Sequence, residues 1–224
     1  MTELECTRLK KMANDITSFN DHQLIDALYW MALGDGTITK PERGECLMRI
    51  SHVLDNQDYI YWKAAILGGM LKCSIKPMET AASMLRITTQ HHPVFTTLYN
   101  RIYGAIGRKS IDPHALKVLG PLGLAILYQD DGSYHYSSDA GHNILIHKMC
   151  FSKFELEAFA KTVVDKFGII FRINQCRGNG LGYRIRLRAK DRTKFFDLIE
   201  PYIVPSMLHK VGRGSTTKSS DDMI

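Results

Sequence analysis

The sequence predicts an α+β fold of two pseudo-symmetric αββαββα repeats, with antiparallel strands and paired helices at the repeat interface. One observation is a pair of apolar stretches, LYWMALGDG ending at Gly36 and LAILYQDDG ending at Gly132. Each stretch finishes in an aspartate followed by glycine, Asp35 in the first and Asp131 in the second. The other observation is that the same order of helices and strands follows each stretch. Recurrence at an interval of roughly a hundred residues indicates an internal duplication.

The first repeat is expected over residues 20–111, after an N-terminal extension of residues 1–19. Its first helix begins after an N-cap at Asp21, and Leu24, Leu28 and Met31 recur at helical spacing. The segment SMLRITTQ alternates like a half-buried strand. By analogy with the second repeat, we expect its partner strand between residues 68 and 82. The remaining elements are strands over 37–40 and 46–53, a helix over 58–67, a strand over 83–90 and a helix over 93–103.

The second repeat is expected over residues 112–211, followed by a small, polar tail of residues 212–224 that predicts disorder. Its motif helix is entered at Pro121, where proline suits the first helical turn. Ser152 with Glu155 predicts a capping box, and Asp191 is the expected N-cap of the last helix. The other elements are strands over 133–137 and 143–150, a helix ending at 168, strands over 169–176 and 183–189 around a glycine-rich turn, and a last helix to about 200.

Composition narrows the class of protein. Hydrophobic residues make up 45% of the 224 residues, which is typical of a folded globular chain. We expect no membrane span, because no apolar run reaches about 20 residues, and no secretory signal, because the N-terminus is charged throughout. The five cysteines lack CxxC spacing, so we expect reduced thiols in an intracellular protein of unspecified compartment. The net charge of +6 is concentrated between residues 172 and 194, which favours a polyanionic partner.

The two helix ends are the strongest candidate site. If the apolar helices pack in parallel, Asp35 and Asp131 meet at one end, and small residues such as Gly34 and Gly123 permit a close approach. Two adjacent carboxylates repel each other, and a divalent cation with oxygen ligands, magnesium or calcium, relieves the repulsion. A single Asp-Gly pair after a helix would indicate only a turn. Its recurrence in both repeats favours the metal site.

These residues resemble a known family. LYWMALGDG and LAILYQDDG are similar to the LAGLIDADG motif of LAGLIDADG homing endonucleases, in the single-chain form with two motifs. The resemblance covers about residues 20 to 211 and includes the closing sequence Pro205–Lys210. It implies a monomeric enzyme that makes a double-strand break in a long asymmetric DNA target by metal-dependent hydrolysis, leaving short 3′ extensions.

The resemblance also implies the site residues. Asp35 and Asp131, helped by the main-chain carbonyls of Gly34 and Asp130, would bind two or three divalent ions, with Mg²⁺ the natural choice. A lysine near each reaction centre is common in the family, and Lys109 and Lys210 close their repeats at similar distances from the acids. The alternative for the lysines is an ordinary solvated surface position.

The strands would form a DNA-binding saddle in the major groove, with alternate residues facing the bases and phosphates. A plain solvent-exposed face is the alternative, which three alternating arginines make less attractive. The candidate DNA-binding residues are Arg49, Ser51, Arg86, Thr88 and Gln90 in the first repeat, and Arg172, Asn174, Arg184, Arg186 and Arg188 in the second.

Other functions stay open at this point. Some relatives of the family are RNA maturases that assist intron splicing, so intron RNA is a possible second partner beside double-stranded DNA. A catalytically inactive DNA-binding regulator of the same fold is a further alternative, although both acids are present. The histidines at His91, His92, His135, His142 and His147 lack the spacing of a structural zinc site.

Overall fold

The computed structural model describes residues 19–79, 81–104, 107–138, 141–149, 151–176 and 182–212, and the side chains of residues 82, 148 and 149 lie outside the description. Most of the expected N-terminal extension, the glycine-rich turn after Cys176 and the tail beyond Gly212 therefore lie outside the described residues. No described helix is long and apolar enough to cross a membrane.

The first half contains a four-stranded antiparallel sheet in the order β1-β2-β4-β3. The strand that was inferred only by analogy is present as β3, paired with β4. The elements are α2 (Asp21–Leu33), β1 (Thr37–Thr39), β2 (Leu47–Val53), α3 (Gln57–Gly68), β3 (Cys73–Met78), β4 (Ala81–Thr89) and α4 (Pro93–Ile102). A short 3₁₀ turn, η1 (Leu54–Asn56), leads into α3.

The second half repeats the plan, with the sheet order β5-β6-β8-β7. The equivalent strand orders, with a helix between the two hairpins of each half, confirm the predicted α+β fold of two repeats. The elements are α5 (Pro113–Val118), α6 (Pro121–Asp131), β5 (Gly132–Ser137), β6 (Gly141–Met149), α7 (Lys153–Phe167), β7 (Phe171–Gln175), β8 (Tyr183–Leu187), η3 (Ala189–Asp191), α8 (Arg192–Ile199), η4 (Glu200–Tyr202) and η5 (Pro205–Val211).

Two local expectations need correction, and one helix was not expected. The N-cap of α2 is Asn20, which forms a capping box with Gln23, and not Asp21. Asp191 does stand at the predicted N-cap position of α8, but its side chain makes no capping hydrogen bond, because its carboxylate accepts hydrogen bonds from the backbone of Ile170 and the guanidinium of Arg188. Helix α5 was not expected; its N-cap Asp112 accepts a hydrogen bond from the backbone N–H two residues on.

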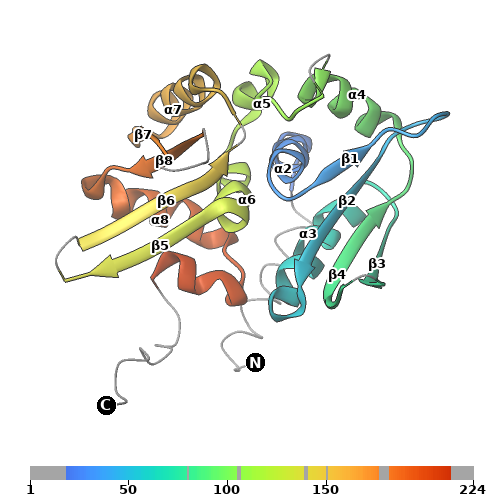
Figure 1. The fold of residues 1–224 in the computed structure, drawn as a ribbon, viewed down its shortest axis with the longest axis horizontal. Helices are drawn as coiled ribbons and strands as arrows, with labels where there is room; N and C mark the ends of the chain where they lie inside the picture. Colours follow the sequence, from blue (N-terminus) through green and yellow to red (C-terminus); the bar gives the residue numbers. More distant parts are fainter. Residues whose placement is uncertain are drawn as a thin grey trace.

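Helices α2 and α6 pack against each other in parallel between the two sheets (Figure 1). Close approach depends on glycine: a Cβ at Gly123 would lie 2.1 Å from Oδ1 of Asp26, and one at Gly34 would lie 2.2 Å from Oδ2 of Asp130. Asp26 of α2 also accepts the Gly123 N–H at 2.7 Å, and so caps the N-terminus of α6, which begins after a glycine. The predicted paired motif helices at the repeat interface are confirmed, and both carry their C-terminal acids to the same end.

Candidate active site at the ends of the paired helices

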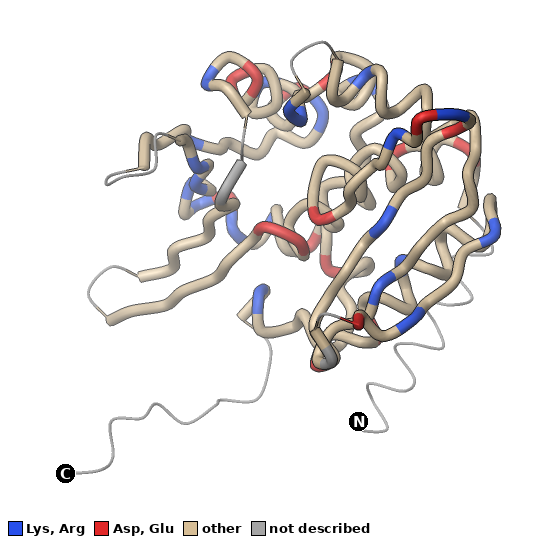
Figure 2. The backbone as a smooth tube through the Cα atoms, turned by 45° about the vertical axis from the view of Figure 1, so that its right-hand side comes forward, with Lys and Arg blue, Asp and Glu red and all other residues tan. Residues whose placement is uncertain are grey.

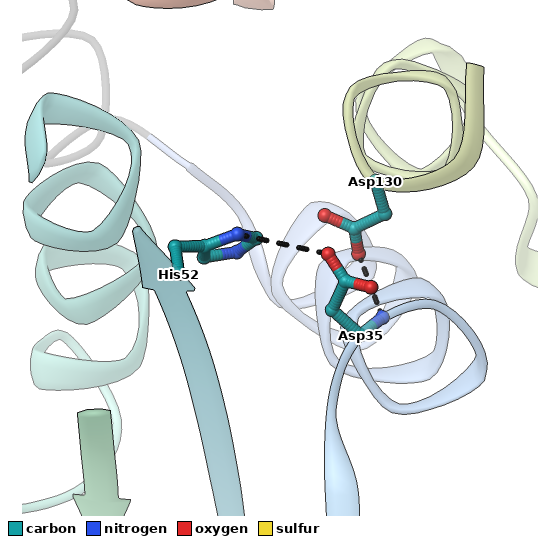
Figure 3. Close-up of side chains that lie close together, drawn as sticks. All are labelled: Asp35, His52 and Asp130. Carbon is teal, nitrogen blue, oxygen red and sulfur yellow. Dashed lines mark hydrogen bonds and ion pairs between the residues drawn. The ribbon is translucent and has the colours of Figure 1, made fainter. Parts of the chain in front are cut away.

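Three aspartates meet where α2 and α6 end. The backbone N–H of Asp35 donates a hydrogen bond of 3.1 Å to Oδ2 of Asp130, which ties the end of α2 to the end of α6 (Figure 3). Asp131, the last residue of α6, follows directly. The two acids that the sequence analysis singled out therefore lie beside a third carboxylate, that of Asp130.

The electrostatics of Asp35 and Asp131 suit a bound cation. Burial, together with repulsion from the Asp130 carboxylate, raises the pKa of Asp35 to about 6 and that of Asp131 to about 7. Among the described residues, none donates a hydrogen bond to the Asp131 carboxylate. Carboxylate oxygens that lie close together and repel each other are the donor set that hard divalent cations prefer. The residues present fit the magnesium site that was expected.

Both candidate lysines reach this cluster. Lys109 Nζ donates to the carbonyl oxygen of Gly34 at 2.5 Å, and Lys210 Nζ donates to that of Gln129 at 2.5 Å and to that of Asp130 at 3.4 Å. Burial lowers the pKa of Lys210, against the attraction of the nearby carboxylates. The ammonium groups thus contact the same helix-end carbonyls that were expected to help hold metal ions.

Asp130 has protein partners of its own. Its Oδ1 accepts a hydrogen bond from the Tyr59 hydroxyl at 2.8 Å and lies 2.5 Å from Nζ of Lys63, in an ion pair whose side chains are both 0% exposed. Burial alone would raise the pKa of Asp130, but the Lys63 ammonium holds it below its usual value. Asp130 is therefore charged, and Lys63 neutralises its charge within the protein. In this it differs from Asp131, whose carboxylate accepts no hydrogen bond from the described residues.

His52 completes the cluster from the core face of β2. Its Nε2 lies 3.1 Å from Lys63 Nζ and its Nδ1 lies 3.6 Å from Oδ2 of Asp35 (Figure 3). Burial and the Lys63 charge lower the pKa of His52 to about 4, so the ring is neutral at pH 7. Because an ammonium can only donate, Nε2 accepts and Nδ1 carries the proton that faces Asp35. One carboxylate oxygen each from Asp35 and Asp130 and a ring nitrogen of His52 lie within 4.8 Å of one another.

Sequence reasoning missed His52, Lys63 and Tyr59. One available signal was the lysine inside YIYWKAAIL, an otherwise apolar helix, because a buried lysine requires a partner. Nothing local identifies that partner, since Asp130 is 67 positions away along the chain.

The outer face of the first sheet carries the candidate DNA-binding residues of the first half. Register places Arg49 opposite Thr88, and Ser51 opposite Arg86, on the face away from the buried Ile50 and Ile87. Arg86 Nε donates to Ser51 Oγ at 3.2 Å. Gln90 is exposed just beyond β4. The same face also presents three positions that were not singled out, which are Thr37, Ser74 and Lys76.

Strands β7 and β8 of the second sheet carry three arginines, Arg172, Arg184 and Arg186, and Figure 2 shows Lys and Arg residues along both sheets. Arg172 stands directly opposite Arg186, and Asn174 opposite Arg184. Among the described residues, no acidic side chain forms an ion pair with these arginines. Arg188 differs, because it lies just beyond β8 and its guanidinium is already paired with both oxygens of Asp191.

The model of the LAGLIDADG DNA endonuclease family matches residues 26–195, which include both helix ends and strands of both sheets. The chain belongs to the LAGLIDADG DNA endonuclease family. Its motif helices are α2 and α6, and its paired acids stand where the two motifs end.

Individual relatives of this LAGLIDADG protein are distant. It is similar to Protein RecA of Mycolicibacterium flavescens, with 27% identity over 88% of this chain and 50% of the relative. It is also similar to the cytochrome b mRNA maturase bI2 of Saccharomyces cerevisiae, with 23% identity over 95% of this chain and 52% of the relative. The chain spans about half or less of the length of the first curated relatives that it matches.

Among solved structures, the homing endonuclease I-WcaI bound to its DNA recognition sequence is similar, with a TM-score of 0.69 and 21% identity over 88% of this chain and 91% of that one. The structure of I-DmoI in complex with DNA and Mn is more distant, with a TM-score of 0.52 and 14% identity over 80% of this chain and 97% of that one. At these identities the likeness concerns the fold, and it agrees with two LAGLIDADG repeats in a single chain.

Proposed function

We propose that this LAGLIDADG protein is a site-specific homing endonuclease that makes a double-strand break in a long asymmetric DNA target by metal-dependent phosphodiester hydrolysis. One observation carries the proposal: two acids and two lysines, one of each from either half, converge at the shared end of two helices. This point lies between two sheets whose outer faces carry basic residues. Both strands of a duplex lying across the sheets would pass the four groups.

Asp35 and Asp131 would hold two or three divalent ions, most naturally Mg²⁺, together with the carbonyls of Gly34 and Asp130. Bound ions would supply an activated water and neutralise charge on the scissile phosphates. The chain contributes the rest: His52 orients the Asp35 carboxylate, and the ammonium groups of Lys109 and Lys210 stabilise negative charge at their reaction centres. The presence of Mn with a solved relative of the same fold supports a divalent cofactor.

The sheet faces support a polyanionic partner. Like charges directly opposite each other on a sheet are destabilising, yet Arg172 faces Arg186 without an ion-paired acid among the described residues. Phosphates would relieve this repulsion. The first sheet offers a more neutral face around Arg49, Ser51 and Thr88. Two unlike faces suit an asymmetric target read by a monomer.

The test is cleavage of a supercoiled plasmid that carries the uninterrupted allele of the locus from which the gene comes. The protein with Mg²⁺ should give a linear product. Asp35→Asn and Asp131→Asn should each reduce double-strand cleavage by at least about a hundredfold, while Asp21→Asn, an exposed change at the start of α2, should leave it unchanged. If either active-site variant cuts both strands at the wild-type rate, the site assignment is wrong.

A maturase is the second candidate, favoured by the similarity to the yeast maturase bI2 over 95% of this chain. The double variant Asp35→Asn/Asp131→Asn separates the two activities, because RNA binding by the outer faces needs neither acid. Splicing of the host intron stimulated equally by wild type and double variant, with no DNA cleavage by either, would replace the endonuclease proposal with the maturase. Loss of cleavage with no effect on any RNA would support the endonuclease alone. Binding to the target without cleavage or splicing would indicate an inactive DNA-binding regulator.

A further inference from the structure

The segment that carries Lys109 is held by a residue of the other half. Glu155, in the first turn of α7, accepts the backbone N–H of Ile111 at 2.9 Å and the Arg108 guanidinium at 3.2 Å. Its side chain is 13% exposed. Lys109 therefore lies between two residues that are both tied to one carboxylate, and its own ammonium contacts the Gly34 carbonyl.

The segment that carries Lys210, in the second half, is held by a residue of the first half. Asp58, in the first turn of α3, accepts the backbone N–H of Ser206 at 2.9 Å, 148 positions along the chain. Ser206 and Lys210 both belong to the 3₁₀ helix η5. The C-terminal end of η5 is fixed by Tyr128 of α6, whose hydroxyl donates a hydrogen bond of 2.6 Å to the Lys210 carbonyl.

The two contacts are related by the pseudo-symmetry of the fold. Asp58 and Glu155 occupy the first turns of α3 and α7, the helices that join the two hairpins of each half. Each is a partly buried acid that receives a backbone N–H from beside the lysine of the other half. An acid in a first helical turn is already favoured by the helix dipole. Capping of α7 explains the position of Glu155 only in part. Its Oε2 accepts hydrogen bonds from the Ser152 backbone N–H and from Arg108, whereas its Oε1 accepts the Ile111 backbone N–H and takes no part in capping.

We propose that Glu155 and Asp58 are crossed positioning residues: each half fixes the reactive lysine of the opposite half. The inference rests on the proposed endonuclease function and adds residues that act through Lys109 and Lys210 without contacting DNA or metal. A lysine has four rotatable side-chain bonds, so its ammonium is placed only if its backbone is fixed. Displacement by about 1 Å at a reaction centre costs up to roughly a hundredfold in rate. Crossed anchoring also couples cleavage of the two DNA strands, because separation of the two halves would release both lysines from their anchors.

The first experiment measures single-turnover cleavage of each strand in a target labelled on both strands. Glu155→Ala should slow by about ten- to a hundredfold the same strand that Lys109→Met slows, with DNA affinity in Ca²⁺ unchanged. Ser152→Ala is the matched control, because it removes the capping box of α7 but leaves the Ile111 and Arg108 contacts. Glu157→Ala, an exposed change on the same helix, is the second control. A loss in Ser152→Ala equal to that in Glu155→Ala would overturn the proposal in favour of simple capping.

A double-mutant cycle tests whether Glu155 acts through the lysine. In the Lys109→Met background, Glu155→Ala should cause less than a twofold further loss, because the group that it positions is gone. A full, multiplicative loss in that background would overturn the positioning role. The same cycle applies to Asp58→Ala with Lys210→Met, with the exposed Asp55→Ala as control. In that cycle the opposite DNA strand should be the one that is cut more slowly.

Hydrogen exchange tests the anchoring without any need for cleavage. In Glu155→Ala, the amide of Ile111 should exchange at least about tenfold faster than in wild type and in Ser152→Ala. In Asp58→Ala, the Ser206 amide should respond in the same way. If wild type cuts no DNA but these amides respond, the endonuclease proposal fails and the crossed anchoring stands as architecture. If wild type cuts DNA and the amides do not respond, the crossed anchoring fails alone.

Discussion

The ends of the two motif helices differ at one position, and that difference organises the centre of the molecule. Gly34-Asp35 directly follows the first helix, whereas Asp130-Asp131 forms the last two residues of the second. The Asp130 carboxylate occupies the space that a side chain at position 34 would need, since a Cβ on Gly34 would lie 2.2 Å from Oδ2 of Asp130. The two ends are therefore complementary in shape and not copies of each other.

The extra carboxylate also changes the electrostatics of one half. Lys63 neutralises Asp130 within the protein, and His52 links the same ammonium to Asp35. Asp35 and Asp131 remain as the two acids for the proposed divalent ions. Although the fold is pseudo-symmetric, His52 and Lys63 both come from the first half, so we expect the two proposed reaction centres to respond differently to mutation.

The largest effect is expected on removing the buried cation. Lys63→Met leaves the Asp130 carboxylate buried and unpaired, which should lower the free energy of unfolding by about 3–5 kcal/mol. Lys63→Met/Asp130→Ala removes both charges and should recover most of that loss. Urea unfolding measures both variants. A single variant as stable as wild type would show that Asp130 needs no internal cation.

The shape complementarity is tested by filling the space at Gly34. Gly34→Ala should cost roughly 1–3 kcal/mol in the free energy of unfolding, because the new methyl group overlaps the Asp130 carboxylate. In the Lys63→Met/Asp130→Gly background the same change should cost much less. An equal cost in both backgrounds, measured by the same denaturation, would mean that contacts other than Asp130 select glycine here.

The pH dependence of folding stability distinguishes Asp131, whose pKa is raised, from Asp130, which Lys63 neutralises. The pKa of Asp131 is raised to about 7 in the folded protein, so the folded state keeps a proton that the unfolded chain loses near pH 4. Folding stability at this site therefore falls as the pH rises from about 4 to 7. Without metal, Asp131→Asn should exceed wild type by on the order of 2 kcal/mol at pH 8, or roughly 4–8 °C in Tm, and by little at pH 4.

Thermal melts with and without Mg²⁺ provide that measurement. Mg²⁺ should raise the Tm of wild type at pH 8 and should raise that of Asp131→Asn less. A Tm difference between the two proteins that stays constant from pH 4 to 8 would contradict the raised pKa.

The smallest effects concern the outer faces of the two sheets. Arg186→Ala should reduce the slope of log affinity against log salt concentration for target DNA by about 0.9, as expected for one lost phosphate contact. Arg86→Ala should reduce it less, because that guanidinium already contacts Ser51 and Met78. Lys161→Ala, an exposed change on α7, is the control. Equal slopes for Arg186→Ala and wild type would exclude Arg186 from the interface.

The sequence by itself determined the repeats, most of the helices and strands, and the two acids at the helix ends. These features are encoded locally: helical spacing in α2, strand alternation in β4 and the Ser152–Glu155 capping box each lie within a few residues. The missing strand β3 followed from the duplication, because the second copy supplied what the first left unreadable.

Only the tertiary structure decided the partners of the charged groups. Lys63 meets Asp130, Asp58 meets the segment before Lys210, and Glu155 meets the segment around Lys109, across separations of 67, 148 and 44 positions for the contacts named. Arg188 pairs with Asp191 only three positions along the chain, although its place in an alternating strand suggested a phosphate contact. The Asp191 carboxylate also accepts the N–H of Ile170, 21 positions away. The strength of such a contact depends on burial and on distance in space, and chain spacing constrains neither.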